Sequence, residues 1–183
     1  MISYLSGELL RKDEKYIILN VKGVGYKVFL SVQNMRSLDN LKKVELFCYT
    51  NTKKDIWEIY GFFSVEALVL FETLIKIAGI GPRAALEVSS LGSLAEIERA
   101  IQEDDRVVID KLFTLGQKKA QAIIFEFSRK IKKHSKEDEI VIKSLRKLGF
   151  EKLEIKETLS QLPPLAAEDK IREVLKLLGK RTK

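Results

Sequence analysis

The hydrophobic pattern of the chain changes its period at Ser64. Residues 1–63 favour β-structure, and beyond them the spacing of apolar residues becomes helical. The first segment contains short runs rich in β-branched and aromatic residues: ISYLSGEL, KYIILNVK, YKVFLSV, KVELFCYT and DIWEIYGFF. Turn signals separate these runs, so they predict a small closed five-stranded barrel of the OB type. The change of period is the clearest domain boundary in the chain.

Helical periodicity continues from residue 64 to about residue 131. It predicts helices over Val65–Ile77, Pro82–Ser90, Leu94–Glu103, Arg106–Leu112 and Gln117–Ile131. The run RKIKKHSKED follows, and we interpret residues 132–138 as a flexible basic linker, with a DNA-gripping arm as the alternative. Residues 139–183 predict three short helices, with Gly149 ending the first of them.

The predicted fold is therefore α+β and multidomain. Residues 1–63 form the OB-type barrel, and residues 64–131 form a helical helix-hairpin-helix domain. Residues 132–138 are the linker, and residues 139–183 form a small C-terminal three-helix, UBA-like bundle.

The segment AGIGPRAA, residues 78–85, lies between two of the predicted helices. Gly79 and Gly81 flank Ile80, so two residues without Cβ bracket one apolar side chain that can plug inward. Pro82 suits the first position of a helix, and the free N–H groups of that helix start would lie next to Arg83. Such a turn can bind phosphate and hold a nucleic-acid backbone without reading bases. An ordinary glycine-rich turn between packed helices is the alternative.

The 183 residues carry a formal net charge of +7, and the isoelectric point is near 9.3. A basic chain suits a polyanionic partner, although the excess charge is spread along the sequence and locates no binding face. The single cysteine, Cys48, cannot form an internal disulfide and is expected to be a buried small hydrophobe. No signal peptide or membrane span is evident in the sequence, so we expect a cytoplasmic protein.

No catalytic grouping with supporting context is found in the sequence. Cysteine and histidine do not occur at metal-ligand spacing, and the chain lacks the GxxxxGK[ST] loop for ATP. The glycines of VKGVGYKV join two strands, and Asp104–Asp105 stand at a helix start. The sequence therefore favours a non-catalytic binding protein without a cofactor or metal. A general helix-hairpin-helix DNA-repair module and an OB-containing nuclease are the alternatives.

The order of these parts resembles the RuvA family of Holliday-junction-binding subunits. The resemblance is carried by MISYLSGELL, VKGVGYKV, IYGFF followed by LFETLIKIAGIGPRAAL, and IREVLKLL near the C-terminus. It implies a homotetramer, or an octamer on DNA, that binds four-way junction DNA by structure rather than by sequence. It also implies recruitment of a RuvB-type hexameric ATPase, which supplies ATP hydrolysis for branch migration in recombination, repair and the SOS response. A RuvC-type junction resolvase is a further partner that the resemblance allows.

The resemblance assigns DNA contacts to two hairpin turns. The first turn contributes Gly79, Ile80, Gly81, Arg83 and Ala84. The second contributes Leu115, Gly116, Gln117, Lys118 and Lys119. The second turn departs from the family pattern, because Phe113 and Thr114 replace the usual Pro-Gly. A β-branched Thr resists positive φ, so we expect a reshaped hairpin or re-aimed amides, while the two lysines can still bind phosphate.

Two further assignments follow from the resemblance. The family carries an acidic pair in the turn before the last barrel strand, at the junction centre, and the aligned residues here are Lys54 and Asp55. We expect Lys54 to offset Asp55, with a solvated strand turn as the alternative. The C-terminal bundle is expected to bind the motor through the apolar residues Leu145, Leu148, Ile171, Leu175 and Leu178. These residues lie in apolar stripes at helical spacing, and the default interpretation of such stripes is that they form the internal core of the bundle.

Overall fold

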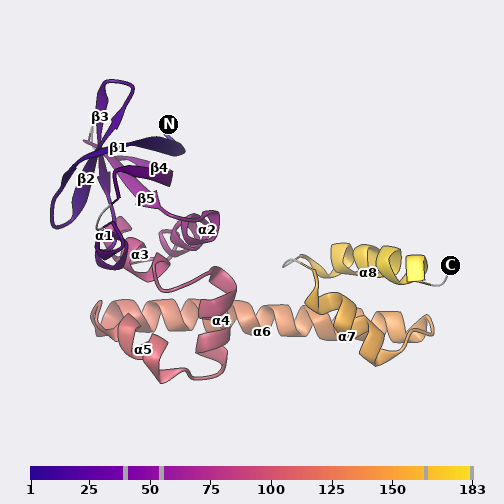
Figure 1. Ribbon diagram of the computed structural model, residues 1–183. Helices are drawn as coiled ribbons and strands as arrows, with labels where there is room; N and C mark the ends of the chain where they lie inside the picture. Colours follow the sequence, from indigo (N-terminus) through magenta and orange to yellow (C-terminus); the bar gives the residue numbers. More distant parts are fainter. Residues whose placement is uncertain (39–40, 54–55, 163–164, 182–183) are drawn as a thin grey trace. The chain divides into compact units, whose positions relative to one another are not determined.

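The fold is taken from a computed structural model, which describes residues 1–38, 41–53, 56–162 and 165–181 (Figure 1). The chain divides into two compact units, Met1–Glu126 and Phe127–Lys183. The first unit contains a barrel followed by helices, and the described part of the second unit consists of helices and their connections.

Five strands close the barrel at the start of the chain. They are β1 (Tyr4–Lys12), β2 (Tyr16–Val21), β3 (Val24–Phe29), β4 (Lys43–Lys53) and β5 (Ile56–Phe62), in the order β1-β2-β3-β5-β4. Neighbouring strands are antiparallel except β3 and β5, which pair in parallel. Closure removes the free edges of the sheet. The closed five-stranded barrel confirms the predicted N-terminal fold.

Alternate strand residues fill the interior of the barrel. Ile17 and Leu19 of β2 are fully buried, whereas Ile18 between them is only partly buried. Cys48 belongs to the same core, as predicted, and burial raises the pKa of its thiol to about 12. Because a protonated thiol is a poor nucleophile, Cys48 contributes packing rather than reactivity.

A short helix, α1 (Val32–Arg36), stands where the sequence predicts the third strand to end. The Oγ of Ser31 accepts the N–H of Asn34 at 3.1 Å and caps this helix. The apolar run YKVFLSV therefore divides between β3 and the helix start. Apolar composition alone does not reveal where a strand gives way to a cap.

Helical structure begins at the predicted boundary. The Oγ of Ser64 accepts the N–H of Ala67 and caps α2 (Val65–Leu74). The helices α3 (Pro82–Ser89), α4 (Leu94–Gln102) and α5 (Arg106–Phe113) follow. The spacing of Ser93 and Glu96 in the sequence predicts a capping box at the start of α4, and reciprocal hydrogen bonds between the two residues confirm it.

The barrel and the first hairpin share one core. The Phe71 ring of α2 packs on Tyr60 and Phe62 of β5, with ring centroids 5.5 and 4.9 Å apart. Phe71 and Phe62 are fully buried. Because α2 is anchored on the last barrel strand in this way, the turn that follows α2 has a fixed position relative to the barrel.

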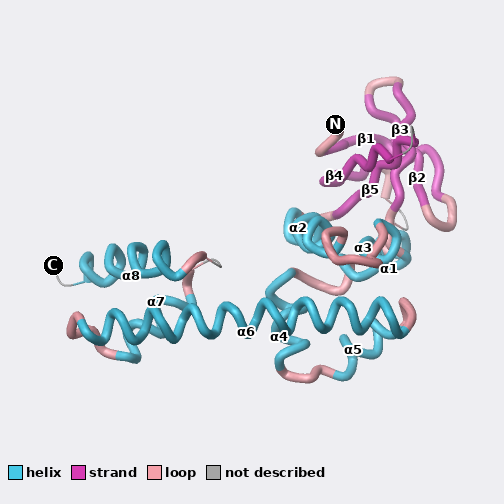
Figure 2. Tube along the Cα trace, turned by 180° about the vertical axis from the view of Figure 1, so that it is seen from behind, coloured by secondary structure: helices cyan, strands magenta, loops and turns pink. Residues whose placement is uncertain are grey.

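Helix α6 runs without interruption from Gln117 to Lys147 (Figure 2). It includes residues 132–138, which corrects the prediction of a flexible linker there. No glycine or proline occurs between Gly116 and Gly149, and lysine and glutamate are good helix formers. Lys133 and Glu137 also form an i,i+4 ion pair with an N–O distance of 3.9 Å. A charged run without a helix breaker therefore continues the helix.

Two shorter helices, α7 (Lys152–Ser160) and α8 (Ala167–Arg181), complete the C-terminal unit. Gly149 follows the end of α6 with φ +94°, as expected for a residue that ends a helix. The buried core consists of Val141, Leu145, Ile155, Val174 and Leu178. Beside it, the buried ammonium of Lys170 in α8 pairs with the Asp138 carboxylate of α6.

Among the described residues, none of the helices is both long and apolar enough to cross a membrane.

Candidate nucleic-acid interface

The first hairpin turn connects α2 to α3 through the segment around Ile80. This side chain is 5% exposed, and its N–H donates to the Ile77 carbonyl at 3.1 Å. Gly79, Gly81 and Arg83 are exposed around it. Ile80 thus plugs into the protein and holds the turn against it, which is the geometry that the sequence predicts.

The start of α3 presents backbone donors that have no acceptor. Gly81 occupies the N-cap position without a side chain to cap it, and Pro82 lacks an N–H. Within the part of the chain that the structure describes, the N–H groups of Arg83 and Ala84 donate to no protein acceptor. The helix dipole favours an anion at this place, so the turn has the geometry of a phosphate site.

The two glycines of this turn differ in backbone conformation. Gly79 has φ +83°, in the left-handed region that favours glycine. Gly81 has φ −88° and ψ 168°, which any residue can adopt, and a Cβ there would meet no atom within 4 Å. The sequence pattern treats the two glycines alike, and the structure distinguishes them. The positive φ favours glycine at position 79. At position 81, glycine would be needed only if a bound ligand came too close to leave room for a side chain.

Arg83 contacts the barrel. Its guanidinium carbon lies 5.1 Å from the centroid of the Phe29 ring, and its Nη2 lies 3.7 Å from a carboxylate oxygen of Glu58. The side chains of Arg83 and Glu58 are 61% and 26% exposed, so the ion pair is weak and a phosphate can compete for the guanidinium. No sequence motif marks Glu58, because it occupies an ordinary position in strand β5.

The Glu58 carboxylate is itself held in place. The hydroxyl of Tyr60 donates to it at 2.7 Å, and burial raises the pKa of this phenol, so it remains a donor at neutral pH. A second carboxylate, Glu87 of α3, accepts the N–H of Val32 at 3.2 Å. Burial raises the pKa of Glu87. The hydrogen bond from Val32 to Glu87 therefore ties α3 to the segment that follows β3.

The second hairpin turn is shorter than the first. Thr114 is the C-cap of α5 and α6 begins at Gln117, which leaves Leu115 and Gly116 as the connection. Thr114 has φ −61°, and the positive φ of +99° falls on Gly116. The turn is therefore reshaped relative to the first, with the positive φ moved from before the apolar residue to after it.

The start of α6 also offers free backbone donors. The N–H of Gly116 donates to the Phe113 carbonyl at 3.0 Å, and that of Lys119 donates to the Gly116 carbonyl at 3.1 Å. Over the described ranges, the N–H groups of Gln117 and Lys118 have no protein acceptor. The side chains of Lys118 and Lys119 are exposed and Leu115 is half-buried. The second helix start thus combines two free amides with two lysines.

The other predicted site residues lie elsewhere. Lys54 and Asp55 are outside the described residues. Leu145 and Leu178 are 0% and 5% exposed in the core of the C-terminal unit, which corrects their assignment as partner contacts.

The remaining apolar residues assigned to partner binding differ in exposure. Ile171 and Leu175 are partly buried against the core of the C-terminal unit, and Leu148 is 64% exposed. A helical unit of this size needs most of its apolar surface to form a core, so the apolar stripes of its helices pack against one another. Among the residues that the structure describes, no His, Cys, Asp and Glu side chains gather in a group that could hold a metal ion.

Together, the fold and the candidate site define a class of protein: a closed OB-type barrel joined to two hairpin turns, each of which exposes a helix start. Comparison with known families agrees with this description. Residues 1–61 match the family model described as the RuvA N-terminal domain, and residues 71–129 match a SAM-like helix-hairpin-helix tandem.

Curated relatives extend the similarity over nearly the whole chain. The protein is 34% identical over 193 residues to the Holliday junction branch migration complex subunit RuvA of Halothermothrix orenii, covering 99% of each chain. It is 31% identical over 197 residues to the corresponding protein of Rickettsia bellii, covering 96% of this chain and 97% of the relative. A third match, to the Acetivibrio thermocellus protein, is 35% identical over 134 residues, 73% of this chain and 66% of the relative. The chain therefore belongs to the RuvA family.

Proposed function

We propose that this protein is a non-catalytic subunit that binds four-way DNA junctions and recruits a RuvB-type ATPase for branch migration in recombination and repair. The observation that carries the proposal is a pair of helix starts whose amides, those of Arg83 and Ala84 and of Gln117 and Lys118, have no acceptor among the described residues. They occur in a chain whose relatives are named as Holliday junction branch migration complex subunits.

The binding should depend on DNA structure and not on base sequence. Backbone amides and lysines bind phosphates, and neither turn presents a recognition element to base edges. Two hairpins in one subunit suit the two strands of one duplex arm. A homotetramer would repeat this arrangement by symmetry and could hold the four arms of a junction.

The turn at Lys54 and Asp55 is part of the proposal as the element nearest the junction centre. A paired positive and negative charge would leave that centre close to neutral and favour a firm grip on the crossover. ATP hydrolysis is assigned to the partner motor, and the complex is expected to act in the cytoplasm.

The central test compares a four-way junction with a linear duplex of the same arm sequences, across a salt series. We expect tighter binding of the junction, indifference to arm sequence and a steep fall of affinity with salt, because binding releases counterions. Equal affinity for junction and duplex would overturn the junction claim.

A variant series extends this test to the second turn. The double variant Lys118→Gln with Lys119→Gln should reduce the salt slope by roughly 2, since each phosphate contact to duplex DNA contributes about 0.9. The matched control, Arg172→Gln with Lys176→Gln on α8, removes the same charge elsewhere and should leave the slope unchanged. An unchanged slope in the first variant would remove the second turn from the interface.

A further inference from the structure

Two aromatic rings and two cations form a continuous strip on the barrel, beside the first hairpin turn. Tyr16 of β2 and Phe29 of β3 are cross-strand partners, and their ring centroids lie 6.1 Å apart. The Lys27 ammonium nitrogen lies 4.0 Å from the Tyr16 centroid and 5.4 Å from the Phe29 centroid. The Arg83 guanidinium carbon lies 5.1 Å from the Phe29 centroid. We call these four residues the ring strip.

The strand period places the barrel residues of the ring strip on the outer face. Ile17 of β2 and Val28 of β3 are fully buried in the barrel core. Because side chains alternate between the two sides of a strand, their neighbours Tyr16, Lys27 and Phe29 point outward. The two aromatic side chains are half-buried and Lys27 is exposed. The ring strip is therefore a surface feature that a ligand can reach.

The charge of Lys27 is held in place but not neutralised. An aromatic ring attracts a cation through its quadrupole and carries no net charge. Over the described part of the chain, Lys27 forms no ion pair. The Asp13 carboxylate, which is hydrogen-bonded to the Tyr16 side chain, pairs with Arg11 at 3.2 Å instead. Lys27 is thus a positioned cation whose charge is available to an anion.

The ring strip is continuous with the phosphate site proposed at the first hairpin turn. Arg83 belongs to that turn, where its N–H and that of Ala84 have no acceptor among the described residues. Lys27 and Arg83 lie over the same ring, so their charged groups are at most about 10.5 Å apart, the two centroid distances taken together. Phosphates of one DNA strand follow one another every 3.4 Å or so along the duplex axis, which is about a third of that span. One strand can therefore contact both cations.

The chemistry of the ring strip favours phosphates over stacked bases. Stacking of a base on an aromatic side chain needs a free ring face. Tyr16 and Phe29 are half-buried and each has a cation over it, so a base would have to displace a cation in order to stack. A phosphate needs no displacement, because it binds the cations themselves.

We propose that Lys27 contacts a phosphate of the junction and that Tyr16 and Phe29 are positioning residues for this contact. The DNA strand bound at the first hairpin turn would continue across the outer face of β2 and β3. Each subunit would then hold DNA with the barrel as well as with its two hairpin turns. This inference rests on the proposed function, because it takes four-way junction DNA as the ligand.

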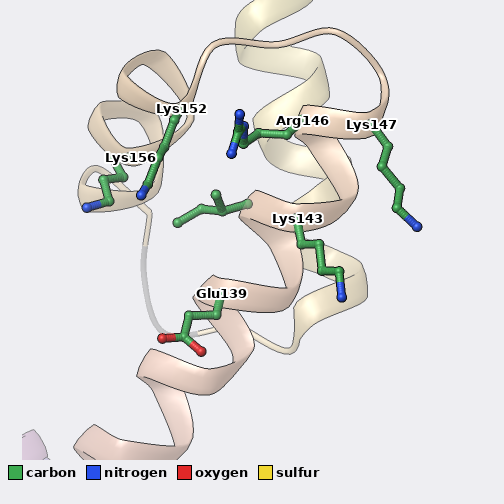
Figure 3. A pocket seen from close by; sticks show the side chains of 7 residues that line it. Glu139, Lys143, Arg146, Lys147, Lys152 and Lys156 are labelled. Carbon is green, nitrogen blue, oxygen red and sulfur yellow. The ribbon is translucent and has the colours of Figure 1, made fainter.

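Exposed cations elsewhere in the chain provide the controls. Lys43 is exposed at the start of β4, a strand that pairs with neither β2 nor β3. In the second unit, Figure 3 shows the cations that line a hollow between α6 and α7: Lys143, Arg146, Lys147, Lys152 and Lys156. Within the described ranges, none of these side chains lies over an aromatic ring. They match Lys27 in exposure and lack its ring contacts.

The test measures the affinity of the full-length protein for a four-way junction across a salt series. At about 50 mM salt, Lys27→Gln should weaken binding by about two- to fivefold for each bound subunit. It should also reduce the salt slope by about 0.9 per subunit, the contribution of one phosphate contact. Lys27→Arg keeps the charge and should keep the slope. The controls Lys43→Gln and Lys143→Gln should bind like the wild type.

A double-mutant cycle tests the positioning role of Tyr16. Tyr16→Leu keeps an apolar side chain against the barrel and removes the ring under the Lys27 ammonium. It should weaken junction binding in the wild type and have little further effect when combined with Lys27→Gln, because it acts through the lysine. A merely structural role of Tyr16 would give additive losses. Circular dichroism and urea denaturation check that each variant is folded.

Four results would overturn the inference. If Lys27→Gln binds the junction like Lys43→Gln, the barrel face is not part of the interface, and the proposed function stands. Additive losses in the cycle remove the positioning role. If Lys27→Gln weakens binding to single-stranded DNA and leaves the junction salt slope unchanged, the ring strip is a base-stacking surface. If the wild type does not prefer a junction to a linear duplex, the proposed function fails and the inference fails with it.

Discussion

Arg83 has two competing anionic partners in the proposed complex, Glu58 and a DNA phosphate. In the free protein, its guanidinium lies beside the Glu58 carboxylate and over the Phe29 ring. The arginine is therefore positioned near the free amides of α3, but a carboxylate accompanies it. Glu58 can assist DNA binding by positioning the Arg83 guanidinium, and it can oppose DNA binding by competing with the phosphate for that guanidinium. The net effect on junction affinity depends on which of the two is larger.

We expect competition to be larger. Glu58→Gln keeps an acceptor for the Tyr60 hydroxyl and removes the negative charge beside the phosphate site. Junction affinity should rise by about two- to fivefold at low salt, because a partly exposed ion pair is worth less than about 1 kcal/mol. The control Glu168→Gln, in the first turn of α8, should change little. Weaker junction binding by Glu58→Gln would show instead that Glu58 orients Arg83.

The two glycines of the first turn give a second prediction at this scale. Gly79→Ala should lower the free energy of unfolding by about 1–2 kcal/mol, because it places a Cβ in the left-handed region. Gly81→Ala should leave the free energy of unfolding unchanged or raise it slightly, since its φ is −88° and the space around it is open. Urea denaturation of both variants measures the difference. Equal destabilisation would contradict the conformations assigned to the two residues.

Helix α6 is the element that departs most from the sequence prediction. Its residues 132–138 carry charges typical of a solvated linker, yet they form a continuous helix with the apolar segments on either side. These residues lie inside the C-terminal unit, Phe127–Lys183, so they belong to that unit and do not form a linker in front of it.

Hydrogen exchange can decide between helix and linker. The amides of residues 132–138 should be protected in the wild type. Lys136→Gly should increase their exchange, since glycine costs about 1 kcal/mol relative to alanine in an exposed helix position. Lys136→Ala is the matched control and should leave protection unchanged or increase it. Fast exchange in the wild type, with no difference between the two variants, would show that residues 132–138 form a flexible linker and not a helix.

The proposed function assigns a separate task to each of the two units. Both hairpin turns lie within residues 1–126, and the core formed by α6, α7 and α8 lies within residues 127–183. We predict that a chain truncated after residue 138 binds four-way junctions with nearly wild-type affinity and no longer stimulates the partner ATPase.

Gel-shift titration and an ATPase assay measure the two effects of this truncation. Loss of junction affinity by the truncated protein, with circular dichroism showing that it is still folded, would assign DNA binding to the C-terminal unit.

Local signals in the sequence predicted much of the fold and part of the candidate site. The change of period at Ser64, the capping box at Ser93 and Glu96 and the plug of Ile80 between two glycines were all confirmed. Each depends on residues a few positions apart, so the sequence alone contains the information. The continuity of α6 is also local. The segment lacks a helix breaker, and this outweighs a charge pattern that is typical of a linker.

Tertiary structure decided the features that depend on residues far apart in the chain. The pairing of Arg83 with Glu58, the burial of Leu145 and Leu178 and the convergence of α6 and α7 cations around one hollow follow from how elements pack. Sequence periodicity reveals which residues are apolar or charged on a helix face, but it does not specify which surface that face meets. A buried stripe and a docking stripe have the same pattern, and only packing distinguishes them.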